Sequence, residues 1–302
     1  MAAHEHHHAD RPHHHGHVHI DEADWQAWAE HTELQGEVLL GFVTETALWA
    51  SELRGPDAPP VGHVLDIGSG PGVGTCELAR LFPDAHVTAI DGSAAMLERA
   101  RHRAAALNVD ARVRTHLAEL PDGLDGLEPA DLIWASMSLH HIGDEVASLR
   151  LLRNLLNPQG LIAIAEFGDP TRMLPEHLDV GRPGLTARLE EVAAAWFAEM
   201  RAGLSGSVPS VDLASMLAVA GFEVIGSRLA RQRLDAPLAD DARRVVLGHL
   251  RRSSDESADR LAPDDLAAID VLTDANDSRS VIHRADVFVD ASQQIVIARP
   301  LT

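Results

Sequence analysis

The sequence contains no lysine and no tyrosine, and its only cysteine is Cys76. Without lysine, Schiff-base chemistry and the phosphate-binding lysine of a P-loop are excluded, and without tyrosine no phenol can act as acid or base. One cysteine cannot form an intrachain disulfide or a cysteine cluster for zinc or iron–sulfur groups. No apolar run approaches the roughly 20 residues that span a bilayer, and the first residues lack the pattern of a signal peptide. We therefore expect a cytoplasmic protein without membrane contact.

The chain has 302 residues, of which 45% are hydrophobic and 24% charged, as is typical of a folded globular protein. This length suits one large α/β domain or two small ones. The formal net charge of −21 repels phosphate backbones and anionic lipids. Nucleic acid is therefore a poor candidate partner, and we expect a small-molecule substrate. The oligomeric state stays open, a homodimer included.

Residues 1–20 hold nine of the nineteen histidines and show no apolar periodicity. We expect a disordered His-rich tail here. Neutral imidazoles bind zinc, nickel or copper, so weak capture of a divalent metal by the tail is one interpretation. The other interpretation is a solvated tail without a ligand.

After the tail, residues 21–57 show the three- and four-residue apolar spacing of an N-terminal helical cap. Residues 58–302 then alternate strands with helices, which predicts a parallel sheet covered on both faces. Two stretches, at about 168–210 and 238–290, interrupt the alternation, and we expect these helical insertions to lie over the strand ends. The predicted strands are 63–68, 86–91, 112–119, 130–138, 160–167, 223–230 and 293–300.

The run VLDIGSGPGVGT places Gly68, Gly70 and Gly72 between the first strand and its helix. Glycines there let the backbone turn sharply and lie against a ligand. A dinucleotide fingerprint requires G-x-G-x-x-G, but the third position is Val73 when counted from Gly68 and a threonine when counted from Gly70. Asp66, just before the turn, would repel a pyrophosphate and suits an ammonium or sulfonium group.

Asp91 ends the next apolar strand, 21 residues after Gly70. A carboxylate at this position can accept hydrogen bonds from both hydroxyls of a ribose, which indicates an adenosine-containing ligand. The alternative is that Asp91 merely caps the helix that begins near Ser93.

Residues 61–167 carry DIGSGPG, AID, LAEL, DLIWASMSLHHIGDE and LLNPQGLIAIAEF in that order, and this series resembles the class I S-adenosylmethionine-dependent methyltransferases. The resemblance implies an α/β, Rossmann-like, doubly wound seven-stranded sheet with an antiparallel last strand, with the N-terminal helices and the insertions forming a lid. It implies that Asp66 approaches the methionine moiety, that Asp91 holds the ribose, and that Glu119 meets the adenine amine unless Ala118 contacts adenine through its backbone. The implied cofactor-binding residues are Asp66, Gly68, Ser69, Gly70, Gly72, Asp91, Gly92, Ala118, Glu119 and Ser136.

Three side chains at the ends of the fourth and fifth strands are candidate catalytic groups: His140, His141 and Glu166. A histidine there could deprotonate an acceptor hydroxyl, or the pair could bond the loop backbone. Glu166 could be a base or an anchor for the lid. On the predicted helix 185–203, Phe197 suits either a wall for an apolar acceptor or core packing. We expect no metal ion in the catalytic site.

The leading hypothesis is in-line transfer of a methyl group from S-adenosyl-L-methionine to oxygen, nitrogen or carbon of a small molecule. One alternative is a protein of this fold that binds the cofactor without methylating. A nicotinamide-dependent oxidoreductase and a metal-handling role of the His-rich tail are the others.

Overall fold

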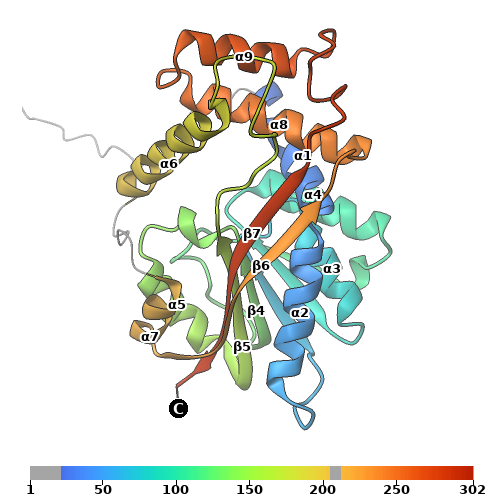
Figure 1. Ribbon diagram of the computed structural model, residues 1–302. Coiled ribbons are helices and arrows are strands. Elements are labelled where there is room, and N and C mark those ends of the chain that lie inside the picture. The colour runs from blue at the N-terminus through green and yellow to red at the C-terminus, as the bar shows by residue number, and fades with distance from the viewer. Residues whose placement is uncertain (1–21, 205–211, 302) are drawn as a thin grey trace, which may run out of the picture.

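The computed structural model describes residues 22–204 and 212–301, so the His-rich tail lies outside the described residues. A seven-stranded sheet forms the centre of the protein (Figure 1). The strands are β1 (His63–Ile67), β2 (His86–Asp91), β3 (Val113–Leu117), β4 (Ala130–Ser136), β5 (Leu156–Phe167), β6 (Phe222–Leu234) and β7 (Val289–Pro300). Their order is β3-β2-β1-β4-β5-β7-β6, and β7 pairs antiparallel with both β5 and β6. The doubly wound fold with an antiparallel last strand is confirmed.

Helices cover both faces of this sheet (Figure 1). On one face lie α2 (Gly41–Arg54), α3 (Val73–Leu81) and α4 (Ala94–Ala106), and on the other α5 (Glu145–Asn154) and α7 (Leu213–Val219). Successive strand residues point to opposite faces, so in β1 Val64 joins the apolar cluster on the α2 side and Leu65 the cluster on the α5 side. Burying such side chains stabilises the fold by about 1.5–3 kcal/mol each. The central strands are therefore apolar on both faces.

Above the carboxyl ends of the parallel strands lie α6 (Leu185–Gly203), α8 (Asp240–Ser257) and α9 (Pro263–Thr273) (Figure 1). These helices pack on one another, α6 on α8 and α8 on α9. Arg188 donates hydrogen bonds to both carboxylate oxygens of Asp265, which is 2% exposed, and so joins α6 to α9. The two insertions thus stand over the strand ends, as the sequence predicts.

The N-terminal stretch forms α1 (Glu22–Val38) followed by α2. Helix α1 contacts α8 and reaches the start of α3, where a Cβ at Gly36 would lie 3.2 Å from Val73. Glu33 of α1 accepts hydrogen bonds from Arg99 (3.0 Å) and Arg103 (2.7 Å) of α4. Helix α1 therefore bridges the lid helices and the helices that follow β1 and β2. The domain boundaries drawn from the sequence stay a prediction.

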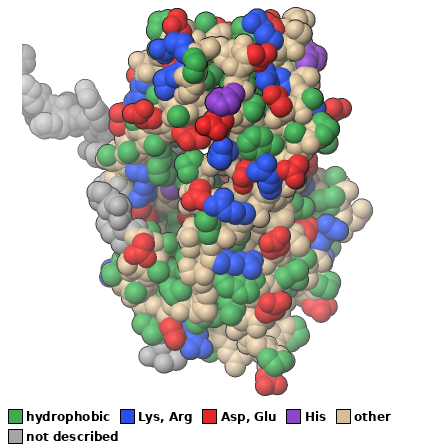
Figure 2. Space-filling model, in the orientation of Figure 1, with side chains coloured by type: hydrophobic (Ala, Val, Ile, Leu, Met, Phe, Trp, Pro, Cys, Tyr) green, Lys and Arg blue, Asp and Glu red, His purple; other side chains and the backbone are tan. Residues whose placement is uncertain are grey.

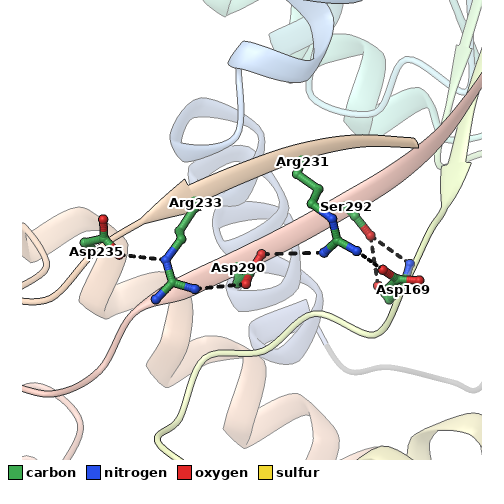
Figure 3. A network of polar contacts seen from close by, with 6 residues as sticks. All are labelled: Asp169, Arg231, Arg233, Asp235, Asp290 and Ser292. Atoms are coloured by element: carbon green, nitrogen blue, oxygen red, sulfur yellow. Dashed lines mark hydrogen bonds and ion pairs between the residues drawn. The ribbon is translucent and has the colours of Figure 1, made fainter. Parts of the chain in front are cut away.

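A polar network joins β6 and β7 to the chain that leaves β5 (Figure 3). Asp290 of β7 accepts from Arg233 at 3.0 Å, and Arg231 pairs with Asp169. Ser292 Oγ accepts from the backbone N–H of Asp169 at 2.7 Å. Exposed ion pairs contribute about 0–1 kcal/mol each, so their main effect is to fix the direction in which the chain leaves β5 toward α6.

The last two strands extend further than the sequence pattern predicts, because β6 continues to Leu234 and β7 begins at Val289. The added β6 segment is polar, with Arg231, Gln232 and Arg233, and shows no apolar run. It can be polar because an edge strand of an antiparallel pair needs only one partner and can face water.

Acidic and basic side chains are interspersed over the face of the molecule seen in Figure 2. Within residues 22–204 and 212–301, no helix is both long and apolar enough to cross a membrane. The same part of the chain holds no group of three or more His, Cys, Asp or Glu side chains that could bind a metal ion.

Candidate active site

The turn between β1 and α3 depends on three glycines with positive φ: Gly68 at +67°, Gly70 at +52° and Gly72 at +81°. A Cβ at Gly68 would lie 2.4 Å from the Cβ of Ser138, and one at Gly72 would lie 2.6 Å from the Cβ of Ala100. A Cβ at Gly70 would meet no described atom within 4 Å. Two of the glycines are therefore required by packing, whereas Gly70 borders open space.

Asp91, half-buried at the end of β2, holds this turn in place. Its Oδ2 accepts from the backbone N–H of Gly70 at 2.9 Å, and its Oδ1 accepts from that of Ser93 at 2.8 Å. Burial raises the pKa of Asp91, and these two backbone hydrogen bonds oppose the rise. Each carboxylate oxygen has a second lone pair, so Asp91 can still accept hydrogen bonds from a ligand. Ser93 itself is the N-cap of α4, since its Oγ accepts from the backbone N–H of Met96.

Asp66 lies beneath the turn and is only 3% exposed. Its Oδ2 accepts a 2.5 Å hydrogen bond from Thr75 Oγ1. Burial raises the pKa of Asp66 to about 7, the nearby Asp91 adds to the rise, and the Thr75 hydrogen bond opposes it. This buried position favours an electrostatic influence on a ligand through the turn over direct contact with it.

The end of β3 meets the end of β2. The backbone N–H of Ala118 donates to the carbonyl of Asp91 at 3.1 Å, and a Cβ at Gly92 would lie 3.9 Å from both the Ala118 carbonyl and the Glu119 Cβ. Ala118 is buried and Glu119 is exposed. The two predicted adenine-side residues thus stand beside the predicted ribose carboxylate.

Two serines complete the set of predicted cofactor residues. Ser69 donates its backbone N–H to the Ile90 carbonyl, and its Oγ is buried with no hydrogen-bond partner in the described part of the chain. Ser136 ends β4, whose residue Ala135 pairs with Ile67 of β1. The register therefore places Ser136 next to the glycine turn.

At the ends of β4 and β5, Glu166 organises a tight turn. Its Oε1 accepts from the backbone N–H groups of Ser138 (3.1 Å) and Leu139 (2.8 Å), and its Oε2 lies 2.6 Å from Nδ1 of His140. Met137 in this turn has φ +53°, which is uncommon for a residue with a side chain and typical of functional sites. The structure thus brings His140 and Glu166 together as one pair.

His141 follows in the same turn, with its ring centroid 4.1 Å from that of His140. The protein around the ring removes part of its hydration, Arg201 adds positive charge nearby, and the carboxylate of Glu166 opposes these two effects. Together these effects lower the pKa of His141 to about 4, although part of the residue still reaches solvent. His141 is therefore neutral at neutral pH.

A cavity of about 470 Å³ opens beside this turn. Three of its lining residues, Phe167 and the helix residues Phe197 and Arg201, come from chain segments far from the turn. Phe167 and Phe197 meet edge to face at 5.2 Å, and Arg201 donates to the carbonyl of His140 at 2.9 Å. Phe197 therefore lines the cavity wall, which is one of its two predicted roles.

Sequence reasoning missed Glu145, Phe167 and Arg201. Glu145 of α5 is 2% exposed and pairs with Arg201 of α6, 56 residues later. No local motif indicates a pair with this separation. The one sequence signal for Phe167 is its position at the end of β5, because parallel sheets bind ligands at the carboxyl ends of their strands.

The comparisons with known proteins find similarity to methyltransferases. The family model of a methyltransferase domain matches residues 61–205. Trans-aconitate 2-methyltransferase of Paracidovorax citrulli is 40% identical over 102 residues, 34% of this chain and 37% of that protein. Malonyl-[acyl-carrier protein] O-methyltransferase of Halorhodospira halophila is 36% identical over 109 residues, 36% of each. The matched segments thus span only about a third of these curated relatives.

Among solved structures, a putative methyltransferase from Bacillus halodurans superposes with a TM-score of 0.50 and 14% identity, covering 84% of this chain and 99% of that one. That likeness concerns the fold. Residues 61–205 are similar to a methyltransferase domain.

Proposed function

We propose that this protein transfers a methyl group from S-adenosyl-L-methionine to a small organic molecule. The observation that carries the proposal is the turn at the carboxyl end of β1, where Asp91 from the end of β2 accepts from the backbone N–H of Gly70 and a Cβ at Gly70 would meet no described neighbour. Ligands of parallel sheets bind at such carboxyl ends. The proposal extends to the whole chain what the matched domain indicates.

The residues around Gly70 fit that cofactor. Asp91 would accept hydrogen bonds from the ribose hydroxyls on its second lone pairs, and Ser69 Oγ, which has no partner among the described residues, would bond to the ligand. Ala118 and Glu119 would meet the adenine, and Asp66 would favour positive charge above the turn. The cofactor supplies a methyl group that its sulfonium already activates.

On the acceptor side, Glu166 orients His140. If His140 Nδ1 donates to Glu166 Oε2, its Nε2 carries a lone pair that can remove a proton from an acceptor. General-base catalysis of this kind is worth about 10²–10⁴ in rate, and alignment of the reactants up to about 7–11 kcal/mol. Neutral His141 is the second candidate base in the same turn.

Two measurements test the proposal. Calorimetric titration should show that S-adenosylhomocysteine binds and that NAD does not. Mass spectrometry of metabolite mixtures incubated with methyl-labelled S-adenosylmethionine should then show a labelled product. Cofactor binding without transfer to any of a broad metabolite set would favour the non-methylating alternative, and binding of NAD alone would reject the proposal.

A further inference from the structure

The cavity beside His140 contains an unusual buried group. Glu145 is 2% exposed, and its Oε1 accepts from Arg201. Its Oε2 is buried and has no hydrogen-bond partner within residues 22–204 and 212–301, yet Glu145 lines the cavity. A buried acceptor without a partner is destabilising, and more so when it is charged. Such an oxygen is stabilised by a ligand that brings an N–H or O–H donor.

The other charges at the cavity favour the same kind of ligand. Glu166 and Asp212 add carboxylates to the lining, whereas Arg201 is its only guanidinium among the described residues. Arg201 already donates to Glu145 Oε1 and to the carbonyl of His140. An incoming carboxylate would therefore meet more acidic groups than basic ones, and Coulomb repulsion is strong in a partly buried site.

The apolar part of the lining indicates what the uncharged part of the ligand is. Phe167 and Phe197 pack edge to face on one side, with His140 tilted against both at 4.7 and 5.6 Å. Met216 and Val296 are further lining residues. Aromatic rings pack well against such walls, and rings carrying an ammonium gain a cation–π attraction.

We propose that this cavity is the acceptor subsite and that it takes an amine with an aromatic or aliphatic body, anchored by its N–H groups at Glu145 Oε2. The proposal rests on the proposed function, because it treats the cavity beside His140 as the place where the methyl acceptor binds. It also separates this protein from its carboxylate-named relatives, since a free carboxylate is disfavoured here. It does not assign which atom of the amine-bearing molecule accepts the methyl group.

The test uses two probes of similar size and opposite charge, phenethylamine and 3-phenylpropanoate. Their affinities are measured by calorimetry on the full chain at neutral pH, with and without S-adenosylhomocysteine. We expect phenethylamine to bind at least about tenfold more tightly, as one charge-assisted hydrogen bond would give. Equal affinities, tighter binding of the carboxylate, or no binding of either probe would overturn the proposal.

Matched variants assign the preference to its residue. Glu145→Gln should remove most of the preference for the amine. The control is Glu199→Gln, because Glu199 is an exposed residue of α6 outside the lining, and this variant should retain the preference. Phe197→Ala should weaken both probes by a similar factor and leave their ratio unchanged. A preference that survives Glu145→Gln would contradict the anchor.

The binding of S-adenosylhomocysteine keeps this inference separate from the proposed function. If Glu145→Gln binds S-adenosylhomocysteine and melts like the parent protein, a lost amine preference reports on the cavity and not on misfolding. If the parent binds S-adenosylhomocysteine but shows no amine preference, the inference fails and the proposed function stands. If the parent fails to bind S-adenosylhomocysteine, the proposed function fails, and the probe ratio still decides the charge preference of the cavity.

Discussion

The glycine turn and the cavity beside His140 are built in different ways. The turn is held by backbone contacts between short segments, such as the Gly70 N–H on Asp91 and the Ala118 N–H on the Asp91 carbonyl. The cavity is lined by side chains of α5, α6, α7 and the last three strands. A site made of backbone turns tolerates amino-acid substitutions at few positions. The side chains that line a cavity can be substituted without moving the sheet. We therefore expect related proteins to bind the same cofactor at the turn and different acceptors in the cavity.

The largest expected effect is on the rate of methyl transfer, after substitution of the two histidines in the turn beside the cavity. His140→Ala should lower kcat by about 10²–10⁴, because the loss of a general base has that magnitude. His141→Ala should lower it much less, since the ring of His141 has no carboxylate such as Glu166 to orient it within the described residues. Single-turnover rates with the identified acceptor measure both. Equal losses would show that the His140–Glu166 pair is structural.

On the turn side, Asp91→Ala should weaken binding of S-adenosylhomocysteine by at least about 100-fold, since two hydrogen bonds to a charged group are worth about 1.5–3 kcal/mol each. The variant should stay folded but lose about 1 kcal/mol from the lost contact at the start of α4. Calorimetry and a thermal melt measure the two effects. An unchanged affinity would remove the ribose assignment.

Substitutions of two glycines of the turn distinguish the effect of packing on stability from the effect of ligand contact on affinity. Gly68→Ala should lower the free energy of unfolding by about 2–4 kcal/mol, because it combines a left-handed backbone with overlap on Ser138. Gly70→Ala meets no neighbour and should cost only about 1–2 kcal/mol. Denaturant unfolding measures both. Gly70→Ala should nevertheless lose affinity for S-adenosylhomocysteine, and a variant that retains it would place the ligand elsewhere.

The smallest effect concerns pH. Since burial raises the pKa of Asp66 to about 7, this carboxyl is neutral below that value and negative above it. Affinity for the cationic S-adenosylmethionine should therefore rise by less than about tenfold between about pH 6 and pH 8. In Asp66→Asn, the same titration should be flat over this range.

Asp66 also links pH to folding. The folded state keeps the proton of Asp66 to higher pH than the unfolded state, so this group lowers stability as pH rises from about 4 to about 7, and no further above that. Asp66→Asn should gain stability relative to the parent over that interval. Parallel pH profiles of the two proteins would refute the raised pKa.

Much of the fold could be predicted from the sequence, because the sequence signals for its helices and strands are local. The strand 86–91 and the helix 185–203 each depend on neighbouring residues, and the structure confirms both. The α/β class followed from the order of such elements, whereas the seven strands and the antiparallel last strand followed from the resemblance to a known family. The long β6–β7 pair was predicted too short, because the pairing that extends it joins residues far apart in the chain.

The sequence by itself determined the sheet, the glycine turn and the carboxylate that faces it, because helix and strand periodicity, glycine conformation and strand-end position act over a few residues. Only the tertiary structure decided that Asp66 is buried beneath the turn, that Glu166 holds His140, and that Glu145 meets Arg201 across 56 residues. Burial and the pairing of charges depend on which distant segments pack together, and that is a property of the whole fold.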